Sequence, residues 1–282
     1  MVGAYYHIAK PERTFTNVIT AVAGYLFASQ WHIKWTFLAL ITGITLVIAS
    51  ASVVNNYTDR RLDQKMERTK KRALVTGATS ARSALIYASA IGIIGFWLLF
   101  YTNQLTLAVI AIGYIGYVVF YGAAKRTTSQ STLIGTIPGG ASLVAGYTAV
   151  TGRFDAAAVI LFLIMVGWQV THFYAIAIYR RKDYAAAGIP VISVKKGVGT
   201  TKLHMWFYLL LFIISAASLT FAGYTGYIYL AGVALLGFLW LHKALQGFKT
   251  QDNEAWARSM FKFSLSALII MMVLISIGPT LP

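Results

Sequence analysis

The sequence predicts an all-α, polytopic membrane protein: a bundle of about nine transmembrane helices around a central cavity open to the cytoplasmic side. Two features of its composition point there, because the 282 residues are 58% hydrophobic and only 11% are charged. No soluble class has this balance. The third observation is that the hydrophobic residues gather in stretches of about 20, the length that a helix needs to cross the hydrocarbon core. The period-two alternation of a barrel strand is absent, which favours helices.

The hydrophobic stretches follow one another without a linker or low-complexity tract between them, so we expect a single domain over residues 1–282. They lie at residues 14–31, 36–55, 81–101, 104–122, 132–150, 156–179, 203–222, 225–245 and 259–278. The fifth stretch contains Gly135, Pro138, Gly139 and Gly140, which allow a close helix contact or a local break.

The basic residues predict the orientation. If the N-terminus is cytoplasmic, all but two of the 24 Lys and Arg residues fall on the cytoplasmic side, and the exceptions are Lys34 and Arg153. This asymmetry is the positive-inside pattern, and it places the C-terminus outside. The net charge of +16 on one side attracts anionic lipid, and it also suits a site for phosphates or carboxylates. Nucleic acid is excluded as a partner, because the cations are spread over membrane loops without a binding module.

The scarce acids predict a site. Only eight Asp and Glu residues occur, and three of them follow the second stretch closely, at Asp59, Asp63 and Glu67. On a helix, Asn55, Asp59 and Asp63 share one face, each about 6 Å further along than the last. Glu67 has Lys70 three residues later in the chain. Asp59 has no Lys or Arg three or four residues later, where a helical neighbour would lie. Acids at a membrane edge are costly and usually functional.

A shared cation explains this repeated like-charge spacing better than a solvated salt-bridge face, although that second interpretation stays open. Oxygen ligands favour Mg²⁺ or Ca²⁺, and the absence of cysteine excludes thiolate metal sites and cysteine nucleophiles. Mg²⁺ is commonly held by one or two carboxylates and by substrate phosphates. Cations that follow the acids would then neutralise a diphosphate: Arg68, Lys71 and Arg72.

Two further residues are candidates. Asp183 opens the second long loop and either pairs with Arg180, three residues before it, or faces the first motif as a ligand of metal or diphosphate. His172, near the end of the sixth stretch, is either a hydrogen-bonded packing residue, a general base or a ligand to a metal in a substrate.

Three segments carry a family resemblance. They are NNYTDRRLDQKMERTKKRAL (Asn55–Leu74), AIAIYRRKDYAAAGIPVISVKKG (Ala175–Gly197) and WARSMFKFS (Trp256–Ser264). Together they closely resemble the UbiA-type intramembrane prenyltransferases, and within them the branch that farnesylates protoheme IX. The resemblance extends over nearly the whole chain.

The resemblance implies a Mg²⁺-dependent enzyme of a bacterial cell membrane that joins farnesyl diphosphate to a vinyl group of heme b. Water addition then gives heme O for terminal oxidase assembly. Asn55, Asp59, Asp63 and Asp183 would hold the metal, and His172 would belong to the catalytic set. The diphosphate would be bound by Arg68, Lys71, Arg72, Lys125, Arg126, Arg180 and Lys182. Contact with heme A synthase or with terminal oxidase assembly is a further expectation.

Other functions remain possible from the sequence. A sibling prenyltransferase that acts on an aromatic or quinone-precursor acceptor would share the first motif. A transporter would present acids near the midplane of the membrane, which this chain does not. A non-catalytic assembly factor would tolerate the loss of Asp59 and Asp63.

Overall fold

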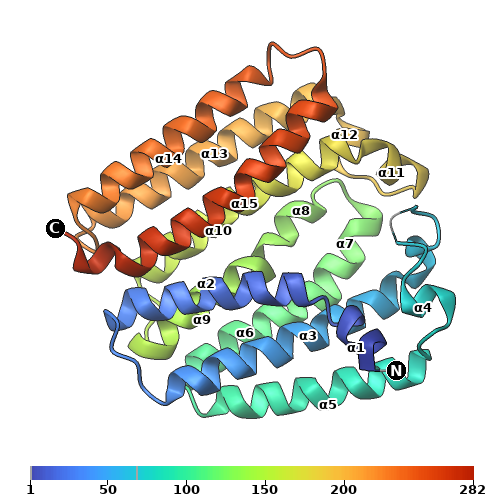
Figure 1. The fold of residues 1–282 in the computed structure, drawn as a ribbon, viewed down its shortest axis with the longest axis horizontal. Coiled ribbons are helices and arrows are strands. Elements are labelled where there is room, and N and C mark those ends of the chain that lie inside the picture. Colours follow the sequence, from blue (N-terminus) through green and yellow to red (C-terminus); the bar gives the residue numbers. More distant parts are fainter. Residues whose placement is uncertain (1, 68) are drawn as a thin grey trace.

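The computed structural model describes residues 2–67 and 69–282, and every regular element within them is a helix. The helices lie side by side in one bundle (Figure 1). The long ones are α2 (Pro11–Ser29), α3 (Thr36–Asp63), α5 (Ala81–Phe100), α6 (Gln104–Ile115) continued by the π-helical segment η1 (Gly116–Tyr121) and α7 (Gly122–Thr127), α8 (Ser131–Ile134) continued by α9 (Thr136–Thr151), α10 (Ala156–Tyr179), α13 (Gly197–Phe221), α14 (Tyr227–Gln246) and α15 (Asn253–Ile277). The short ones are α1 (Val2–Ile8), α4 (Ala73–Thr76), α11 (Arg181–Ala186), α12 (Ile192–Lys195) and η2 (Gly278–Thr280). The predicted all-α bundle is confirmed.

Eight helical segments within the described ranges are long and apolar enough to cross a membrane. They correspond to all the predicted stretches except the first, residues 14–31. That stretch forms α2, which is less apolar because its first turns carry Glu12 and Arg13. α2 still runs along the bundle, and the N- and C-termini lie at opposite ends of it (Figure 1). An odd number of crossings produces that arrangement, so the prediction of about nine agrees with the fold.

Local sequence explains where several helices begin. Pro11 is at the start of α2, where its fixed φ suits the first helical turn and its missing N–H costs nothing. Asp155 accepts a hydrogen bond from the backbone N–H of Ala158 at 3.2 Å and so caps α10. Asn103 caps α6 in the same way, through the N–H of Thr106 at 2.9 Å. Such caps satisfy backbone donors that a helix leaves unpaired at its start.

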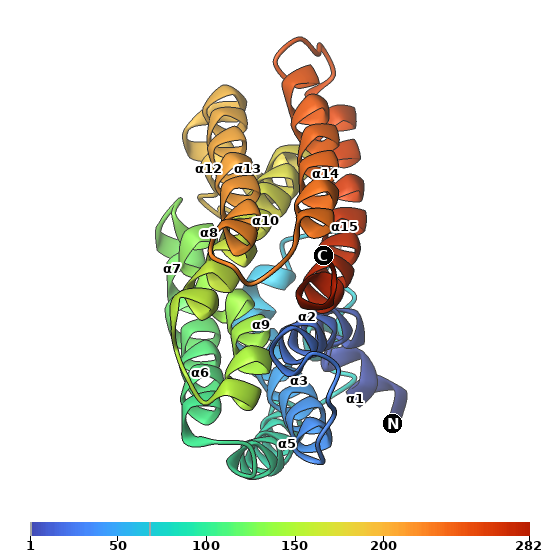
Figure 2. The ribbon, with the colours of Figure 1, turned by 90° about the vertical axis from the view of Figure 1, so that its left-hand side faces the viewer.

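The long helices form two groups, which Figure 2 shows one above the other. One group contains α2, α3, α5, α6 and α9, and the other contains α10, α13, α14 and α15. Within the groups the most extensive contacts join α3 to α5, α2 to α9 and α10 to α13. The groups meet where α10 packs on α9 and where α15 packs on α2. Residues of both groups line one cavity, which is described below.

The crossing of α2 and α9 depends on two glycines. A Cβ added to Gly24 would clash with the carbonyl oxygen of Leu143 on α9. A Cβ added to Gly146 on α9 would clash with the carbonyl oxygen of Ala21 on α2. The two backbones therefore touch directly, as small residues allow in membrane bundles. This contact sets the position of α2 beside the site described next.

Candidate active site

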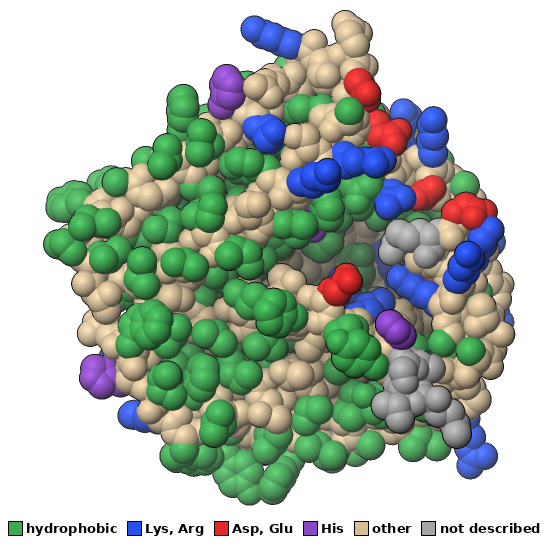
Figure 3. All heavy atoms as spheres, viewed as in Figure 1, with side chains coloured by type: hydrophobic (Ala, Val, Ile, Leu, Met, Phe, Trp, Pro, Cys, Tyr) green, Lys and Arg blue, Asp and Glu red, His purple; other side chains and the backbone are tan. Residues whose placement is uncertain are grey.

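A cavity of about 590 Å³ opens at the end of the bundle where α3 and α10 end. We call this the basic end, because the cavity is lined there by Lys10, Arg13, Arg72, Lys125 and Arg180. Figure 3 shows this face of the molecule hollowed, with Lys and Arg side chains gathered beside the hollow. Away from that end the walls are mostly apolar side chains: Val47, Ile48, Ala51, Ile110 and Met165.

The predicted acidic face of α3 lies on the cavity wall. Asn55, Asp59 and Asp63 are all buried, and all three line the cavity. α3 continues without a break from the apolar stretch through Asp63, so the helix that crosses the membrane also carries the acids. The amide of Asn55 donates a hydrogen bond to Oδ2 of Asp59. The spacing of four therefore acts as predicted, placing the three side chains on one face.

Each carboxylate on this face has a cation brought from elsewhere in the chain. Lys125, at the end of the α6–η1–α7 helix, forms an ion pair with Oδ2 of Asp59. Nη1 of Arg72 lies 2.6 Å from Oδ2 of Asp63. Arg126 is more exposed, but its Nη2 lies 3.5 Å from Oδ1 of Asp59 and donates to the carbonyl of Thr58 at 2.6 Å. Asp59 is thus neutralised by a residue 66 positions away, and Asp63 by one nine positions later in the loop that follows α3, and helix spacing could predict neither pair.

Asp183 lines the same cavity from α11 and is half-buried. Nη1 of Arg180 lies 3.4 Å from its Oδ2, so the i−3 pairing considered from the sequence does form. Arg180 also lines the cavity, and its guanidinium packs over the ring of Tyr179 at 5.1 Å. The two long loops therefore meet at one mouth of the cavity, as the prediction of facing motifs required.

His172 lies on α10 and is buried, with one edge on the cavity. Its Nδ1 is 2.7 Å from the hydroxyl oxygen of Ser264 on α15. Its ring stacks on Trp168, with centroids 4.9 Å apart. The hydrogen-bonded packing role considered from the sequence is present, and the cavity position leaves a direct chemical role open as well.

The other predicted anion-binding residues are placed less centrally. Lys71 and Lys182 are exposed and do not line the cavity. Arg68 lies outside the described residues. Three of the seven cations predicted to bind the diphosphate line the cavity: Arg72, Lys125 and Arg180.

The comparisons with known proteins decide the family. The profile of the UbiA prenyltransferase family matches residues 17–266. A protein of Serratia proteamaculans named protoheme IX farnesyltransferase is 45% identical over 98% of this chain and 95% of its own length. A protein of the same name from Yersinia enterocolitica is 45% identical over 100% of this chain and 96% of its own length.

The chain belongs to the UbiA prenyltransferase family.

Solved structures show that the UbiA-type fold is shared at much lower identity. A structure of digeranylgeranylglyceryl phosphate synthase in membranes has a TM-score of 0.84 at 19% identity, covering 99% of this chain and 98% of that one. A UbiA homolog from Archaeoglobus fulgidus, bound to GPP and Mg²⁺, has a TM-score of 0.67 at 14% identity, covering 97% of this chain and 99% of that one. The bundle described above is therefore the UbiA fold.

The residues of this UbiA-family site fit a Mg²⁺ ion shared with a substrate. No group of three or more His, Asp or Glu side chains comes together in the described ranges, so a cage made of protein alone does not fit. Two carboxylates and one amide of α3 do line the cavity together, at Asp59, Asp63 and Asn55. Oδ1 of Asp59 is buried and accepts no hydrogen bond from the residues described. Mg²⁺ is commonly bound by one or two carboxylates with the remaining positions taken by phosphate and water.

Four cavity residues were missed as site candidates by the sequence analysis: Lys10, Arg13, Tyr117 and Tyr121. Arg13, on α2, donates a hydrogen bond to the hydroxyl of Tyr117. The rings of Tyr117 and Tyr121 stack, with centroids 5.6 Å apart. Both tyrosines lie on η1, and π-helical segments are frequent at functional sites. The signal that the sequence offers at this wall is Lys10-Pro11 with Asn17, which resembles the opening segment of the family.

Lys10 carries a testable electrostatic signature. Burial lowers the pKa of its amine well below the usual range, and the nearby guanidiniums of Arg13 and Arg72 lower it further, against the raising effect of Asp59 and Asp63. A bound diphosphate would favour the charged amine, so its pKa should rise on binding. The protein should then take up protons on binding, at pH values between the free and bound pKa.

Calorimetric titration of farnesyl diphosphate in buffers of different ionisation enthalpy measures this uptake. The substitution Lys10→Met keeps the length of the side chain and should reduce the uptake. An uptake that is unchanged in Lys10→Met would assign the proton to another group.

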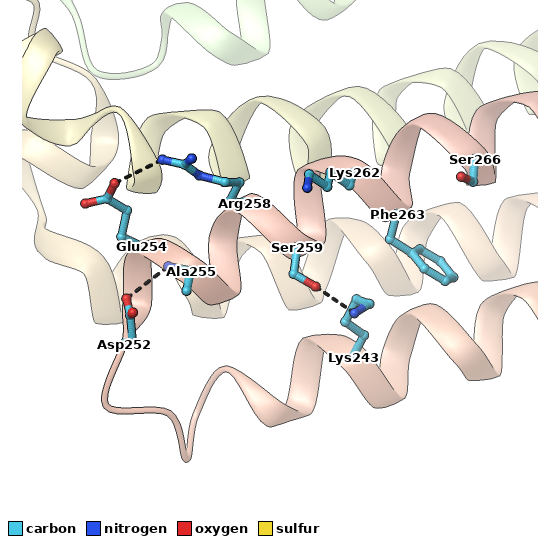
Figure 4. Close-up of a pocket in the computed structure, with 9 residues that line it drawn as sticks. All are labelled: Lys243, Asp252, Glu254, Ala255, Arg258, Ser259, Lys262, Phe263 and Ser266. Atoms are coloured by element: carbon cyan, nitrogen blue, oxygen red, sulfur yellow. Dashed lines mark hydrogen bonds and ion pairs between the residues drawn. The ribbon is translucent and has the colours of Figure 1, made fainter.

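A second hollow lies between α14 and α15, and Figure 4 shows its lining. Its polar groups largely pair with one another: Lys243 donates to Ser259 at 2.7 Å, and Arg258 lies 3.3 Å from Glu254. Asp252 caps the N–H of Ala255 at 2.9 Å. This second hollow contains none of the predicted site residues, so the cavity between the two helix groups remains the candidate active site.

Proposed function

We propose that this chain transfers the farnesyl group of farnesyl diphosphate to a vinyl group of heme b and that water addition yields heme O. The observation that carries the proposal is that Asn55, Asp59 and Asp63 of α3 share one cavity with several Lys and Arg side chains. The chain is also 45% identical to a protein named protoheme IX farnesyltransferase. The acceptor assignment follows those relatives, and the donor assignment has independent support from the geometry.

The diphosphate would lie at the basic end. Asn55, Asp59 and Asp63 would hold Mg²⁺ from the protein side, with Asp183 facing them across the mouth. Held there, Mg²⁺ supplies positive charge that stabilises the departing diphosphate. Lys125 and Arg72, which now neutralise Asp59 and Asp63, would turn to the phosphate oxygens when the ion takes their place. Lys10, Arg13 and Arg180 would complete the cation ring.

The reaction balances with these groups in place. The allylic C–O bond of farnesyl diphosphate breaks, and its electron pair leaves with the diphosphate. The π electrons of the heme vinyl group form the new C–C bond to the farnesyl carbon. Water then adds to the cation on the former vinyl carbon and loses a proton. The cations of the site act on the first step, where negative charge develops on the leaving group.

The apolar part of the cavity suits the farnesyl chain. Val47, Ile48 and Ala51 lie on the same helix as the acids and continue away from the basic end. Across from them are Ile110 and Tyr114. These walls would order the isoprenoid and would keep water from the allylic cation until the C–C bond has formed.

The membrane orientation belongs to the same proposal. The chain is a multi-pass membrane protein, and with its basic end in the cytoplasm the N-terminus is cytoplasmic and the C-terminus outside. Farnesyl diphosphate would then reach the cavity from the cytoplasm. Heme O would leave for terminal oxidase assembly, and contact with heme A synthase stays a prediction.

Purified protein incubated with heme b, farnesyl diphosphate and Mg²⁺ tests the function. We expect heme O by mass spectrometry, loss of product when a chelator removes the metal, and recovery when Mg²⁺ is returned in excess. The absence of heme O, together with prenylation of an aromatic acid or a quinone precursor, would move the chain to the sibling activity. Full product formation with the chelator present would contradict the metal site.

A further inference from the structure

We propose that Nε2 of His172 is an axial ligand to the iron of the heme acceptor, with Ser264 as the residue that orients it. This inference rests on the proposed function, because it assigns the anchor of that acceptor. The heme would then lie against the wall formed by α10 and α15, and the prenyl diphosphate would lie against α3.

The hydrogen bonds around His172 determine its tautomer. The hydroxyl of Ser264 donates its proton to the carbonyl oxygen of Phe261 at 2.6 Å. Because a serine hydroxyl has a single proton, and Ser264 gives it to Phe261, we assign the contact of 2.7 Å between its oxygen and Nδ1 of His172 as one that the imidazole donates. The neutral ring therefore carries its proton on Nδ1 and has a free lone pair on Nε2. Histidines that bind metals typically have their other ring nitrogen fixed in this way.

The free nitrogen faces the cavity. No described residue forms a hydrogen bond with Nε2. The atom is also not fully buried, so it remains accessible. His172 lines the cavity, so Nε2 opens into it. Trp168 stacks on the ring, and Phe173 and Phe261 have centroids 5.2 and 5.1 Å away. These aromatic neighbours hold the ring in one orientation.

His172 lies at about the same depth in the bundle as the proposed metal face of α3. It lies seven residues before the end of α10 at Tyr179, or about 10 Å along the helix. Asn55 lies eight residues before the end of α3 at Asp63, or about 12 Å. Both helices end at the basic end, so an iron held by His172 would face the level of Asn55 and Asp59 on the opposite wall. The edge of the macrocycle would then lie at the depth where the diphosphate leaves.

The same wall offers an apolar opening for a planar macrocycle. Leu265 lines the cavity and is 44% exposed, on the outward side of α15. Thr16 lines it from α2, the helix beside α15. Figure 3 shows the hollow on this face between the two helices, next to surface covered by hydrophobic side chains. Heme dissolved in the bilayer would reach His172 through this gap.

Resonance Raman spectroscopy of the ferrous heme b complex tests the ligand directly, without farnesyl diphosphate and with protein that carries no polyhistidine tag. We expect an iron–histidine stretching band in the wild type and in His204→Ala, which removes a histidine that does not line the cavity. The band should be lost in His172→Ala and restored in His172→Gly by added imidazole. Ser264→Ala should keep the band but weaken heme binding about tenfold.

Two results would overturn the assignment. One is a band unchanged in His172→Ala, and the other is a wild type that forms heme O but shows no such band in its bound heme. Failure of the proposed function has a different signature, because the wild type would then form no heme O in the product assay.

Discussion

Replacing Asp59 with asparagine should lower kcat for heme O formation by about 10²–10³-fold, the usual cost of removing one preorganised electrostatic contact. Asp59 is buried and is bonded by Asn55 and Lys125, and its Oδ1 accepts no hydrogen bond from the described residues, although Nη2 of Arg126 lies 3.5 Å away. Asparagine keeps the size of the side chain but removes the negative charge with which Asp59 would hold Mg²⁺. Steady-state kinetics at saturating farnesyl diphosphate, over a series of Mg²⁺ concentrations, measures the loss.

The same segment supplies the matched control. Glu67 is four residues beyond Asp63, but its side chain is 81% exposed and it pairs only with Lys70 among the described residues. Glu67→Gln removes the same charge and should leave kcat near that of the wild type. The double substitution Asp59→Asn with Lys125→Met removes the unpaired cation, and it should remain as inactive as Asp59→Asn. Equal activity of Asp59→Asn and Glu67→Gln would contradict the proposed metal face.

Replacing Gly24 with alanine should destabilise the fold by about 3 kcal/mol or more, at the upper end of the range for overpacking. The added Cβ would meet backbone atoms of Leu143 and Tyr147 on α9, and backbone cannot move aside as a flexible side chain can. α2 would be forced away from α9, and Arg13 and Asn17 on the cavity wall would move with it. Thermal unfolding in detergent, followed by circular dichroism, measures the stability.

Gly199 provides the control for this substitution. It is exposed on α13, and a Cβ added there would meet nothing within 4 Å. Gly199→Ala should therefore stabilise the helix slightly, by about 0.5–1 kcal/mol, because alanine has the higher helix propensity. Similar unfolding temperatures for Gly24→Ala and Gly199→Ala would show that α2 and α9 do not depend on the close crossing.

Several elements were predictable because their causes are local. The helical stretches follow from runs of apolar residues, and the common face of Asn55, Asp59 and Asp63 follows from a spacing of four. Apolar composition ended the second stretch at residue 55, whereas the spacing of Asn55, Asp59 and Asp63 anticipated a helical face beyond it, and α3 does continue to Asp63. Polar residues at the end of a membrane helix lower its hydropathy without breaking it, so a composition-based boundary ends too early.

The partners of Asp59 and His172 could not be predicted in the same way. Lys125 is 66 residues from Asp59 in the chain, and Ser264 is 92 residues from His172. No periodicity links such pairs, because they meet only when separate helices pack. The anion-binding residues show the same limit: Lys71 follows the acidic motif closely and is exposed, whereas Lys10, far from it in sequence, lines the cavity.

The sequence alone therefore determined the class of the protein, its helices, its family resemblance and the acidic face of α3. Each of these depends on composition or on residues a few positions apart. The tertiary structure decided which cations neutralise Asp59 and Asp63, that α2 and η1 contribute to the cavity, and that Nδ1 of His172 contacts Ser264. These properties depend on which helix faces meet across the bundle, and close backbone contacts such as that of Gly24 with α9 set that arrangement.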